Sequence, residues 1–296
     1  MKTGFIALAG RPNAGKSTLL NALFQRKLAI VSSKAQTTRT QIRGILTEPD
    51  EYQIIFTDTP GIHKPHHLLE SRMNKEAGGA IQGTDLIYLV VDASVPYAQG
   101  DAFVLNMVKQ AGVPVFLILN KTDKMKKEQV VKCLERWQSR FSFAEYFALS
   151  AMKQKDFKDL LKTSAKYLPE GELMYPANEI SDEPENFYIA EIIREKVLQC
   201  TEEEVPHATA VLVERKQKKK DVFYIQAVIL VERDGQKGIL IGKQGSMLNK
   251  IGSRARLELQ EYLGGKVYLE LFVRVEPEWR DRAGRISEYG YGLTDE

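Results

Sequence analysis

The stretch FIALAGRPNAGKST, residues 5 to 18, decides the fold. An apolar run leads directly into GRPNAGKS, which matches the phosphate-loop pattern G-x-x-x-x-G-K-[ST]. The two glycines let the backbone wrap around an anion with its amide groups inward, and the next helix adds the positive end of its dipole. Lys16 can reach the β- and γ-phosphates, and the Ser17 hydroxyl can ligate magnesium. The stretch therefore predicts a nucleotide site at a strand–loop–helix junction.

Short apolar runs alternate with helix-length segments from Thr3 to about Leu168. Most of these runs lack polar alternation, as expected for parallel strands that are covered on both faces. The exception is a pair separated only by the turn-like EPDE, Glu48–Glu51, which predicts an antiparallel hairpin at one edge of the sheet. The expected strands are Phe5–Ala9, Ile42–Thr47, Tyr52–Thr57, Leu86–Asp92, Val115–Leu119 and Tyr146–Leu149.

Two later motifs fall where a nucleotide switch needs them. DTPG, Asp58–Gly61, begins at the end of an apolar strand, where a carboxylate can hold the magnesium shell and the Gly61 amide can bond the γ-phosphate. NKTD, Asn120–Asp123, closes another strand. Its aspartate would accept two hydrogen bonds from guanine that adenine cannot donate, and such a site strongly rejects the analogue that lacks the donors. The stem of Lys121 can cover the base.

These motifs, with SAM at Ser150–Met152 as a source of backbone amides for the guanine oxygen, predict an enzyme that hydrolyses GTP to GDP and phosphate. The predicted class is α/β, a P-loop GTPase domain over residues 1–168 with a mixed, mostly parallel sheet wrapped by helices. The expected nucleotide-binding residues are Gly10, Arg11, Pro12, Asn13, Ala14, Gly15, Lys16, Ser17, Thr18, Asp58, Thr59, Pro60, Gly61, Asn120, Lys121, Asp123, Ser150 and Ala151.

The composition changes between Leu168 and Phe187, where prolines and acidic residues replace the periodic pattern. We expect an exposed linker at residues 169–186 and a second, smaller α+β domain at residues 187–296. Its elements run helix, strand, strand, helix, helix, strand, starting with an amphipathic helix at Phe187–Thr201. The last strand, Lys266–Val275, precedes a charged C-terminal tail.

GKQG, Gly242–Gly245, lies between two helical segments of this second domain. A GxxG turn lets a nucleic-acid backbone approach closely, as in KH domains, which hold about four nucleotides in this way. From Arg215 to Arg256 there are eleven lysines and arginines against three acidic residues, the footprint of a polyanion site. The element order matches the type II KH arrangement. The expected RNA-binding residues are Gly242, Lys243, Gln244, Gly245, Lys250 and Arg254.

Through both sets of motifs, nearly the whole chain resembles a bacterial family of translation-factor-related GTPases that carry a type II KH domain. The resemblance implies that QTTRT, Gln36–Thr40, is the first switch. Its magnesium-binding threonine would be Thr38, with Thr37 as the alternative, so the magnesium ligands would be Ser17, Thr38 and Asp58. Lys16, Thr38 and Gly61 would act in catalysis. The implied partners are the 30S subunit and single-stranded RNA near the 3′ end of small-subunit ribosomal RNA, and the implied role is assembly of that subunit.

Asn13 and Ile62 raise a question about catalysis. Related GTPases place a water-orienting glutamine directly after DxxG, whereas this chain has Ile62 there. The isoleucine side chain can neither form a hydrogen bond to water nor transfer a proton. In relatives that share the loop asparagine, a potassium ion against the phosphates takes part instead. The sequence leaves two interpretations open: Asn13 helps to hold potassium, or it braces the loop through its own backbone.

The composition of the whole chain fits these expectations. Of 296 residues, 43% are hydrophobic and 27% charged, as in globular proteins. Two distant cysteines give no disulfide framework, and the HKPHH histidines at residues 63–67 favour a polar second switch over a zinc site. We expect a cytoplasmic monomer. The alternative is a signalling GTPase whose C-terminal domain binds protein at the membrane surface, and peripheral membrane contact stays open.

Overall fold

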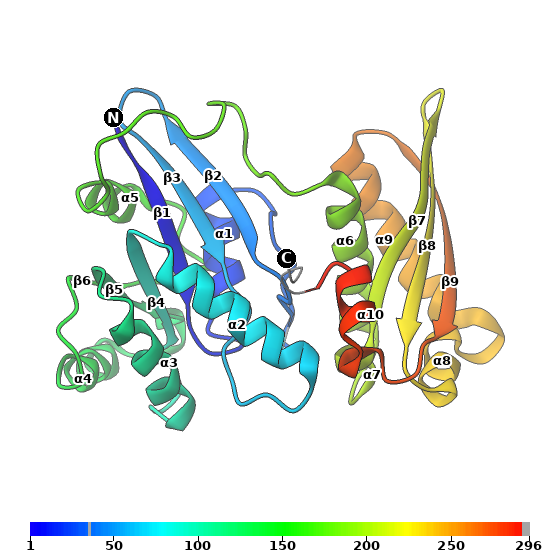
Figure 1. Ribbon diagram of the computed structural model, residues 1–296, viewed down its shortest axis with the longest axis horizontal. Helices are drawn as coiled ribbons and strands as arrows, with labels where there is room; N and C mark the ends of the chain where they lie inside the picture. Colours follow the sequence, from blue (N-terminus) through cyan, green and yellow to red (C-terminus); the bar gives the residue numbers. More distant parts are fainter. Residues whose placement is uncertain (35–36, 292–296) are drawn as a thin grey trace. The chain divides into compact units, whose positions relative to one another are not determined.

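The computed structural model describes residues 1–34 and 37–291, which form two compact units (Figure 1). Unit 1 comprises Met1–Ala29, Thr38–His66 and Glu70–Asp182, and unit 2 comprises Ile30–Thr37, His67–Leu69 and Glu183–Glu296. Gln36, expected in the first switch, and the end of the expected tail, residues 292–296, lie outside the described residues.

Unit 1 is built on a six-stranded sheet with the order β2-β3-β1-β4-β5-β6. β2 and β3 pair antiparallel at one edge, and the other neighbouring strands pair parallel. The mostly parallel sheet with an antiparallel edge hairpin is thus confirmed. The strands are β1 (Lys2–Ala9), β2 (Ile42–Glu48), β3 (Tyr52–Asp58), β4 (Leu86–Asp92), β5 (Val115–Asn120) and β6 (Glu145–Ala148).

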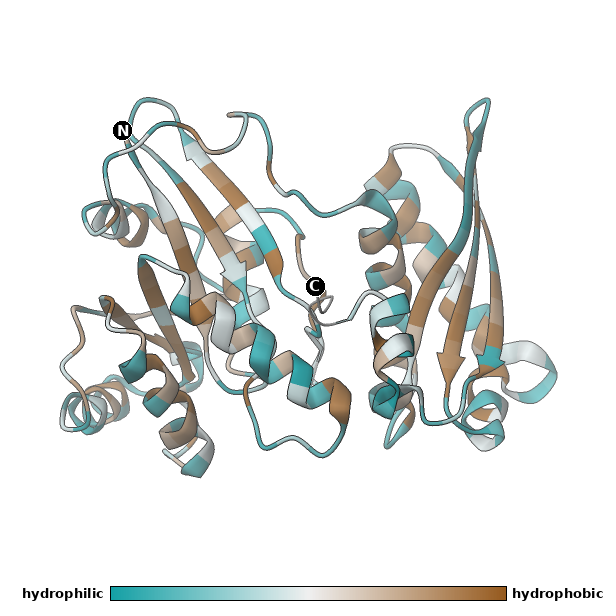
Figure 2. Ribbon diagram, in the orientation of Figure 1, coloured by the Kyte–Doolittle hydropathy of each residue, from teal (hydrophilic) through white to brown (hydrophobic). Residues whose placement is uncertain are grey.

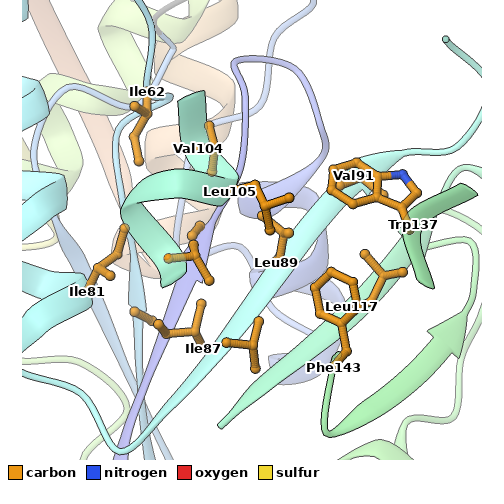
Figure 3. Packing of buried hydrophobic residues seen from close by; sticks show 14 of the residues in the cluster. Ile62, Ile81, Ile87, Leu89, Val91, Val104, Leu105, Leu117, Trp137 and Phe143 are labelled. Atoms are coloured by element: carbon orange, nitrogen blue, oxygen red, sulfur yellow. The ribbon is translucent and has the colours of Figure 1, made fainter. Parts of the chain in front are cut away.

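Helices cover this sheet and bury its central strands. Every residue of β3 and β5 is buried, which explains why their sequences show no alternation. Figure 3 shows the packing on one face, where Leu89 and Leu117 of the sheet meet Leu105 and Trp137 of the helices. The helices of unit 1 are α1 (Lys16–Phe24), α2 (Leu68–Gln82), α3 (Gln99–Gln110), η1 (Thr122–Lys124), α4 (Lys127–Gln138) and α5 (Lys158–Ala165).

The segment expected to be a linker runs along unit 1 instead of leaving it at once. The Thr3 amide donates to the Pro169 carbonyl at 3.0 Å, and the Ile45 amide donates to the Ile180 carbonyl at 2.8 Å. Because β2 is an edge strand, the backbone amides on its outer side have no neighbouring strand to bond to and can donate to this segment. Backbone hydrogen bonds, together with the ion pair between Arg43 and Asp182 at 3.1 Å, therefore hold this segment against unit 1 up to Asp182.

Unit 2 has the expected order of elements around a three-stranded sheet, β7-β8-β9. β7 and β8 pair antiparallel, and β8 and β9 pair parallel. Figure 2 shows the hydrophilic tip of the β7–β8 hairpin beyond its hydrophobic strands. The elements are α6 (Glu185–Cys200), α7 (Val205–Ala208), β7 (Ala210–Lys219), β8 (Val222–Val231), α8 (Asp234–Ile241), η2 (Lys243–Gly245), α9 (Ser246–Leu263), β9 (Lys266–Val275), η3 (Trp279–Asp281) and α10 (Ala283–Glu288).

The residues after β9 differ from the expected charged tail. η3 and α10 form there, and Trp279 is fully buried, with its indole N–H donating to the Ala208 carbonyl at 2.8 Å. Tyr289 packs edge-on against this indole. Because charged residues surround these aromatic residues in the sequence, the sequence pattern did not predict a packed aromatic cluster here.

Within residues 1–34 and 37–291, we find no helix with the length and apolar character needed to cross a membrane.

Candidate nucleotide site and nucleic-acid interface

The phosphate loop joins β1 to α1, and its two glycines are required by space. A Cβ atom on Gly10 would lie 2.3 Å from the Val90 carbonyl oxygen. Gly15 has φ +97°, and a Cβ atom there would lie 2.2 Å from Nδ2 of Asn120. Larger residues at either position would push the loop away from the carboxyl ends of the strands. The loop therefore closes tightly where the parallel sheet places its functional residues.

Lys16 occupies the centre of this loop. Its Nζ donates to the carbonyl oxygens of Gly10 at 3.2 Å and Arg11 at 3.3 Å. Burial lowers the pKa of Lys16, and the nearby Asp58 carboxylate partly offsets this. A buried ammonium group held by two carbonyls is ready to exchange them for phosphate oxygens.

Ser17, Thr38 and Asp58 converge on one point of unit 1. The Ser17 hydroxyl donates to Oδ2 of Asp58 at 2.6 Å and lies 2.8 Å from the Thr38 hydroxyl, which itself lies 3.2 Å from Oδ2. Oδ1 of Asp58 is buried and has no hydrogen-bond partner among the described residues. Burial raises the pKa of Asp58, against the opposing effects of Lys16 and the two hydroxyls. Two hydroxyls and a buried carboxylate are the oxygen ligands that a hard divalent cation takes.

The two threonines of the expected first switch behave differently. The Thr38 hydroxyl belongs to the Ser17–Asp58 cluster, whereas the Thr37 hydroxyl donates to the Lys34 carbonyl at 2.8 Å. Of the two, Thr38 thus has the geometry of a ligand.

The DTPG turn lies against the phosphate loop. A Cβ atom on Gly61 would lie 2.7 Å from the Cα atom of Pro12, and the Thr59 hydroxyl donates to the Leu8 carbonyl at 2.7 Å. Ile62, the residue after the turn, is 1% exposed and points into the hydrophobic core near Val104 (Figure 3). Its side chain is therefore part of the packing beneath the site.

The NKTD turn ties three loops together through Asn120. Its Nδ2 donates to the Ala14 carbonyl at 3.0 Å, and its Oδ1 accepts from the Ala151 amide at 3.0 Å. Lys121 donates from Nζ to the Asn13 carbonyl at 2.6 Å, so its stem crosses from this turn to the phosphate loop. A base placed beside that stem would meet groups of both loops.

Asp123 is fixed for hydrogen bonding. Its Oδ1 accepts from the Ser150 hydroxyl at 2.7 Å, and this bond lowers the pKa of Asp123. An ionised carboxylate held in one orientation is the acceptor that the two guanine donors require.

Unit 1 thus brings the expected nucleotide residues to one edge of its sheet, at the ends of β1, β3, β5 and β6. Arg11 is anchored by an ion pair with Asp101 of α3 at 3.0 Å. Asn13 has φ +62°, a backbone conformation that asparagine tolerates better than most residues.

The sequence motifs did not identify two residues that hold parts of the nucleotide site in place. Asp92, at the end of β4, pairs with Nζ of Lys121 at 2.6 Å and so fixes the lysine. Glu76 of α2 accepts through Oε1 from the Gln41 amide at 2.7 Å and from the Thr40 hydroxyl at 3.0 Å. The position of Asp92 at a strand end was a usable signal, but Glu76 belongs to no motif.

In unit 2, the GKQG turn joins α8 to α9 with an unusual backbone. Gly242, Gln244 and Gly245 have φ of +69°, +51° and +79°. A Cβ atom on Gly242 would lie 2.8 Å from Cβ of Met247, so glycine is required there. A Cβ atom on Gly245 would have as its nearest neighbour Nδ2 of Asn249, at 3.9 Å, which leaves its outer side open for a ligand backbone.

Cationic side chains flank this turn. Lys243 is exposed within it, and Lys250 and Arg254 are exposed one helical turn apart on α9. The Nη1 atom of Arg254 lies 3.6 Å from the Cys200 thiol, which orients the guanidinium group without neutralising it. The expected RNA-binding residues therefore lie together, on one turn and the first half of α9.

Comparison with protein families separates the same two parts of the chain. Residues 5–121 match the family model described as 50S ribosome-binding GTPase, and residues 204–280 match the KH domain model.

Three similar proteins match nearly the full length of both chains. A protein of Clostridium kluyveri named GTPase Era is 46% identical over 292 residues, which cover 98% of this chain and 99% of the relative. A solved structure of Aquifex aeolicus Era bound to GDP·AlF4⁻ is 39% identical, with a TM-score of 0.95, and covers 99% of this chain and 100% of that one. A solved Era complex with MgGDPNP and nucleotides 1506–1542 of 16S ribosomal RNA has the same identity and coverage, with a TM-score of 0.96.

Proposed function

This chain belongs to the Era family and is a GTPase, and we propose that it couples this activity to RNA binding during assembly of the small ribosomal subunit. Its second unit binds single-stranded RNA near the 3′ end of small-subunit ribosomal RNA. The proposal draws on the sites of each unit and on the relative that was solved with nucleotides 1506–1542 of 16S ribosomal RNA.

The phosphates of GTP would lie in the loop between β1 and α1. Lys16 would exchange its bonds to Gly10 and Arg11 for the β- and γ-phosphate oxygens. The Gly61 amide, held against Pro12, would donate to the γ-phosphate. Because the loop and the turn are packed together, these donors need little rearrangement to stabilise developing charge.

The cluster of Ser17, Thr38 and Asp58 fits Mg²⁺. The buried Oδ1 of Asp58 is without a partner in the described chain, and the two hydroxyls lie 2.8 Å apart beside the other carboxylate oxygen. Mg²⁺ held there would supply positive charge that offsets the charge of the phosphate oxygens. In the proposed site Ser17 and Thr38 ligate the ion, and Asp58 holds its shell. A relative solved with MgGDPNP supports the choice of Mg²⁺ as the ion bound with the nucleotide.

Guanine selectivity would come from Asp123, with Lys121 covering the base. Ser150 holds the carboxylate in place at 2.7 Å, and the Ala151 amide, held by Asn120, can reach the guanine oxygen. Adenine offers no donors to Asp123, so it would leave a carboxylate unpaired.

The attacking water needs a partner other than Ile62, whose side chain is buried in the core. We propose that a potassium ion at Asn13 contributes charge stabilisation. The left-handed backbone of Asn13 supports the competing interpretation, a structural role in the loop. A comparison of hydrolysis in potassium and sodium separates the two.

The open GKQG turn between exposed cations carries the RNA-binding proposal. Gly245 leaves room on its outer side, and Lys243, Lys250 and Arg254 supply positive charge around it. A sugar–phosphate backbone can approach such a turn closely while its bases lie along the neighbouring groove.

Crosslinking in cells, followed by sequencing of the attached RNA, tests the assignment of the RNA. The proposal predicts reads concentrated at the 3′ end of small-subunit ribosomal RNA, and reduced crosslinking for Gly245→Asp. Reads spread evenly over unrelated RNAs would contradict it. Crosslinks to protein alone would favour a signalling role.

A further inference from the structure

The sheet of unit 2 has a second face, opposite the helices. Alternate residues of β8, such as Ile225 and Ile229, pack in the core with α6, α8 and α9. Since side chains alternate along a strand, Tyr224 points to the opposite side. We call this side the outer sheet face and define it by Arg215, Lys219, Tyr224, Tyr268 and Phe272.

Three aromatic side chains of the outer sheet face are exposed. Tyr224 is 40% exposed, and Tyr268 and Phe272 are each 53% exposed. Tyr224 and Tyr268 are paired in register across β8 and β9, with ring centroids 5.6 Å apart and an interplanar angle of 46°. Phe272 lies four residues further along β9, about 13 Å from Tyr268 at the usual rise of a strand. The rings form two separate apolar platforms on one face.

Cationic groups border the Tyr224–Tyr268 pair. Nζ of Lys219 lies 5.7 Å from the centroid of the Tyr224 ring, and Arg215 is exposed on the same strand, β7. The carboxylate of Glu270 also lies on this face, where its Oε2 accepts from Gln226 at 2.6 Å and its Oε1 accepts from the Tyr268 hydroxyl at 3.3 Å. Both oxygens of this carboxylate therefore have a hydrogen-bond donor.

The surface around the rings is hollowed. One hollow of about 360 Å³ is lined by Arg215, Lys219, Tyr224 and Tyr268, among others. A second, of about 500 Å³, lies around Phe272. Each hollow thus combines an aromatic wall with polar groups.

We propose that the outer sheet face binds single-stranded RNA, with bases stacked on Tyr268 and Phe272 and phosphates held by Arg215 and Lys219. Exposed rings beside cations are the combination that holds unpaired nucleotides, because every base has a stacking face. The exposed cations of this face, Arg215 and Lys219, favour a polyanion over a protein surface. This surface extends the RNA-binding function proposed above beyond the GKQG turn, and that turn belongs to the helical layer of the unit.

The test measures the affinity of the full chain for a fluorescent uridine 12-mer. Tyr268→Thr and Phe272→Thr each remove a ring and keep a residue that suits strands. Each should weaken binding by roughly fivefold or more, as loss of one base stack does. Tyr146→Thr is the matched control, because it removes an exposed strand tyrosine from unit 1 and should leave RNA affinity unchanged. Unchanged GTP hydrolysis and circular dichroism establish that the variants are folded.

Two further measurements identify stacking as the cause. An abasic 12-mer, which has the same sugar–phosphate backbone but no bases, should bind the wild type and Tyr268→Thr with equal affinity. Lys219→Gln should reduce the slope of log affinity against log salt by about 0.7, whereas Tyr268→Thr should leave the slope unchanged. Unchanged uridine 12-mer affinity in a folded Tyr268→Thr, Phe272→Thr double variant would overturn the proposal. If Tyr268→Thr lost as much affinity for the abasic 12-mer as for the uridine 12-mer, the proposal would also be overturned.

The result separates this surface from the GKQG turn. In a Gly245→Asp chain, the residual 12-mer affinity should fall by a further factor of roughly five when Tyr268→Thr is added. If Gly245→Asp alone had no effect while Tyr268→Thr reduced affinity, the turn assignment would fail and the outer sheet face would stand.

Discussion

The Ser17 hydroxyl donates a 2.6 Å hydrogen bond to Oδ2 of Asp58, joining the end of the phosphate loop to the end of β3. Asp58 is fully buried, and its other oxygen lacks a partner within the part of the chain that the structure describes. An uncompensated buried carboxylate oxygen is costly unless a ligand satisfies it. The pair therefore marks the point where phosphate, divalent cation and protein would meet.

The first prediction uses the two neighbouring threonines as a matched pair. Thr38→Ala removes the hydroxyl that lies 2.8 Å from Ser17 and should slow GTP hydrolysis by about 100-fold, as loss of one stabilising group typically does. Thr37→Ala removes only a bond to the Lys34 carbonyl and should leave the rate close to that of the wild type. Single-turnover hydrolysis over a magnesium titration measures both. Equal defects in the two variants would refute the assignment of Thr38.

The second prediction concerns the base. Asp123→Asn should shift selectivity from GTP towards XTP, because the new amide can donate to the xanthine oxygen and no longer accepts both guanine donors. Competition between GTP and XTP for binding gives the selectivity directly. Ser150→Ala removes the 2.7 Å bond that holds the carboxylate. This variant should bind both GTP and XTP more weakly and still prefer GTP. Retained GTP preference in Asp123→Asn would exclude this role.

The third prediction decides between the two interpretations of Asn13. If it helps to hold potassium, hydrolysis should be faster in potassium than in sodium at equal ionic strength, and Asn13→Ala should abolish the difference. Asn13→Gly tolerates the φ of +62° and so separates loss of the side chain from backbone strain. Equal rates in both salts for the wild type would leave Asn13 with a structural role only.

The fourth prediction follows from the buried Glu76. Burial raises the pKa of this carboxyl above its ordinary value of 4.5, against the opposing bonds from Gln41 and Thr40. The folded protein therefore holds the proton to higher pH than the unfolded chain, so the free energy of unfolding falls as pH rises through that window. Glu76→Gln is neutral at every pH and can still accept from both donors.

The thermal unfolding temperature of Glu76→Gln should accordingly exceed that of the wild type at neutral pH, and the difference should vanish below the ordinary glutamate range. Calorimetry on nucleotide-free protein from pH 3 to pH 8 measures this difference. Glu135→Gln, an exposed change on α4, is the control and should show no such trend. A wild type that gains stability relative to Glu76→Gln as pH rises would contradict the argument.

The motifs made much of the nucleotide site predictable, because each follows a continuous apolar strand. Strands of that kind belong to a parallel sheet, whose carboxyl ends meet at one edge, so Gly10, Asp58 and Asn120 had to converge. The antiparallel hairpin was equally readable from the short turn at Glu48–Glu51. For these elements the local sequence pattern alone specifies the strand arrangement that is found in the folded protein.

Contacts between distant segments could not be predicted in the same way. Glu76 is one carboxylate on a mixed helix, and its bond to the Gln41 amide depends on how α2 packs. Trp279 stands among charged residues, and its burial depends on the Ala208 carbonyl 71 positions earlier. The segment near Ile180 is held by a backbone bond to Ile45 and by the ion pair between Arg43 and Asp182, which join positions far apart in the sequence. Such contacts are set by tertiary packing, and a periodic pattern carries no record of them.

The RNA affinity of Gly245→Asp, measured together with its GTP affinity, decides whether the GKQG turn binds RNA independently of the nucleotide site. The change places bulk and negative charge where the structure leaves room for a phosphate backbone, so single-stranded RNA binding should weaken at least about tenfold while GTP binding is unchanged. Gly245→Asn suits the same left-handed backbone and separates bulk from charge. Gly284→Asp, at an open glycine of α10, adds an identical charge away from the turn and should have no effect. Unaltered RNA affinity in a folded Gly245→Asp protein would exclude the GKQG turn as an RNA-binding site.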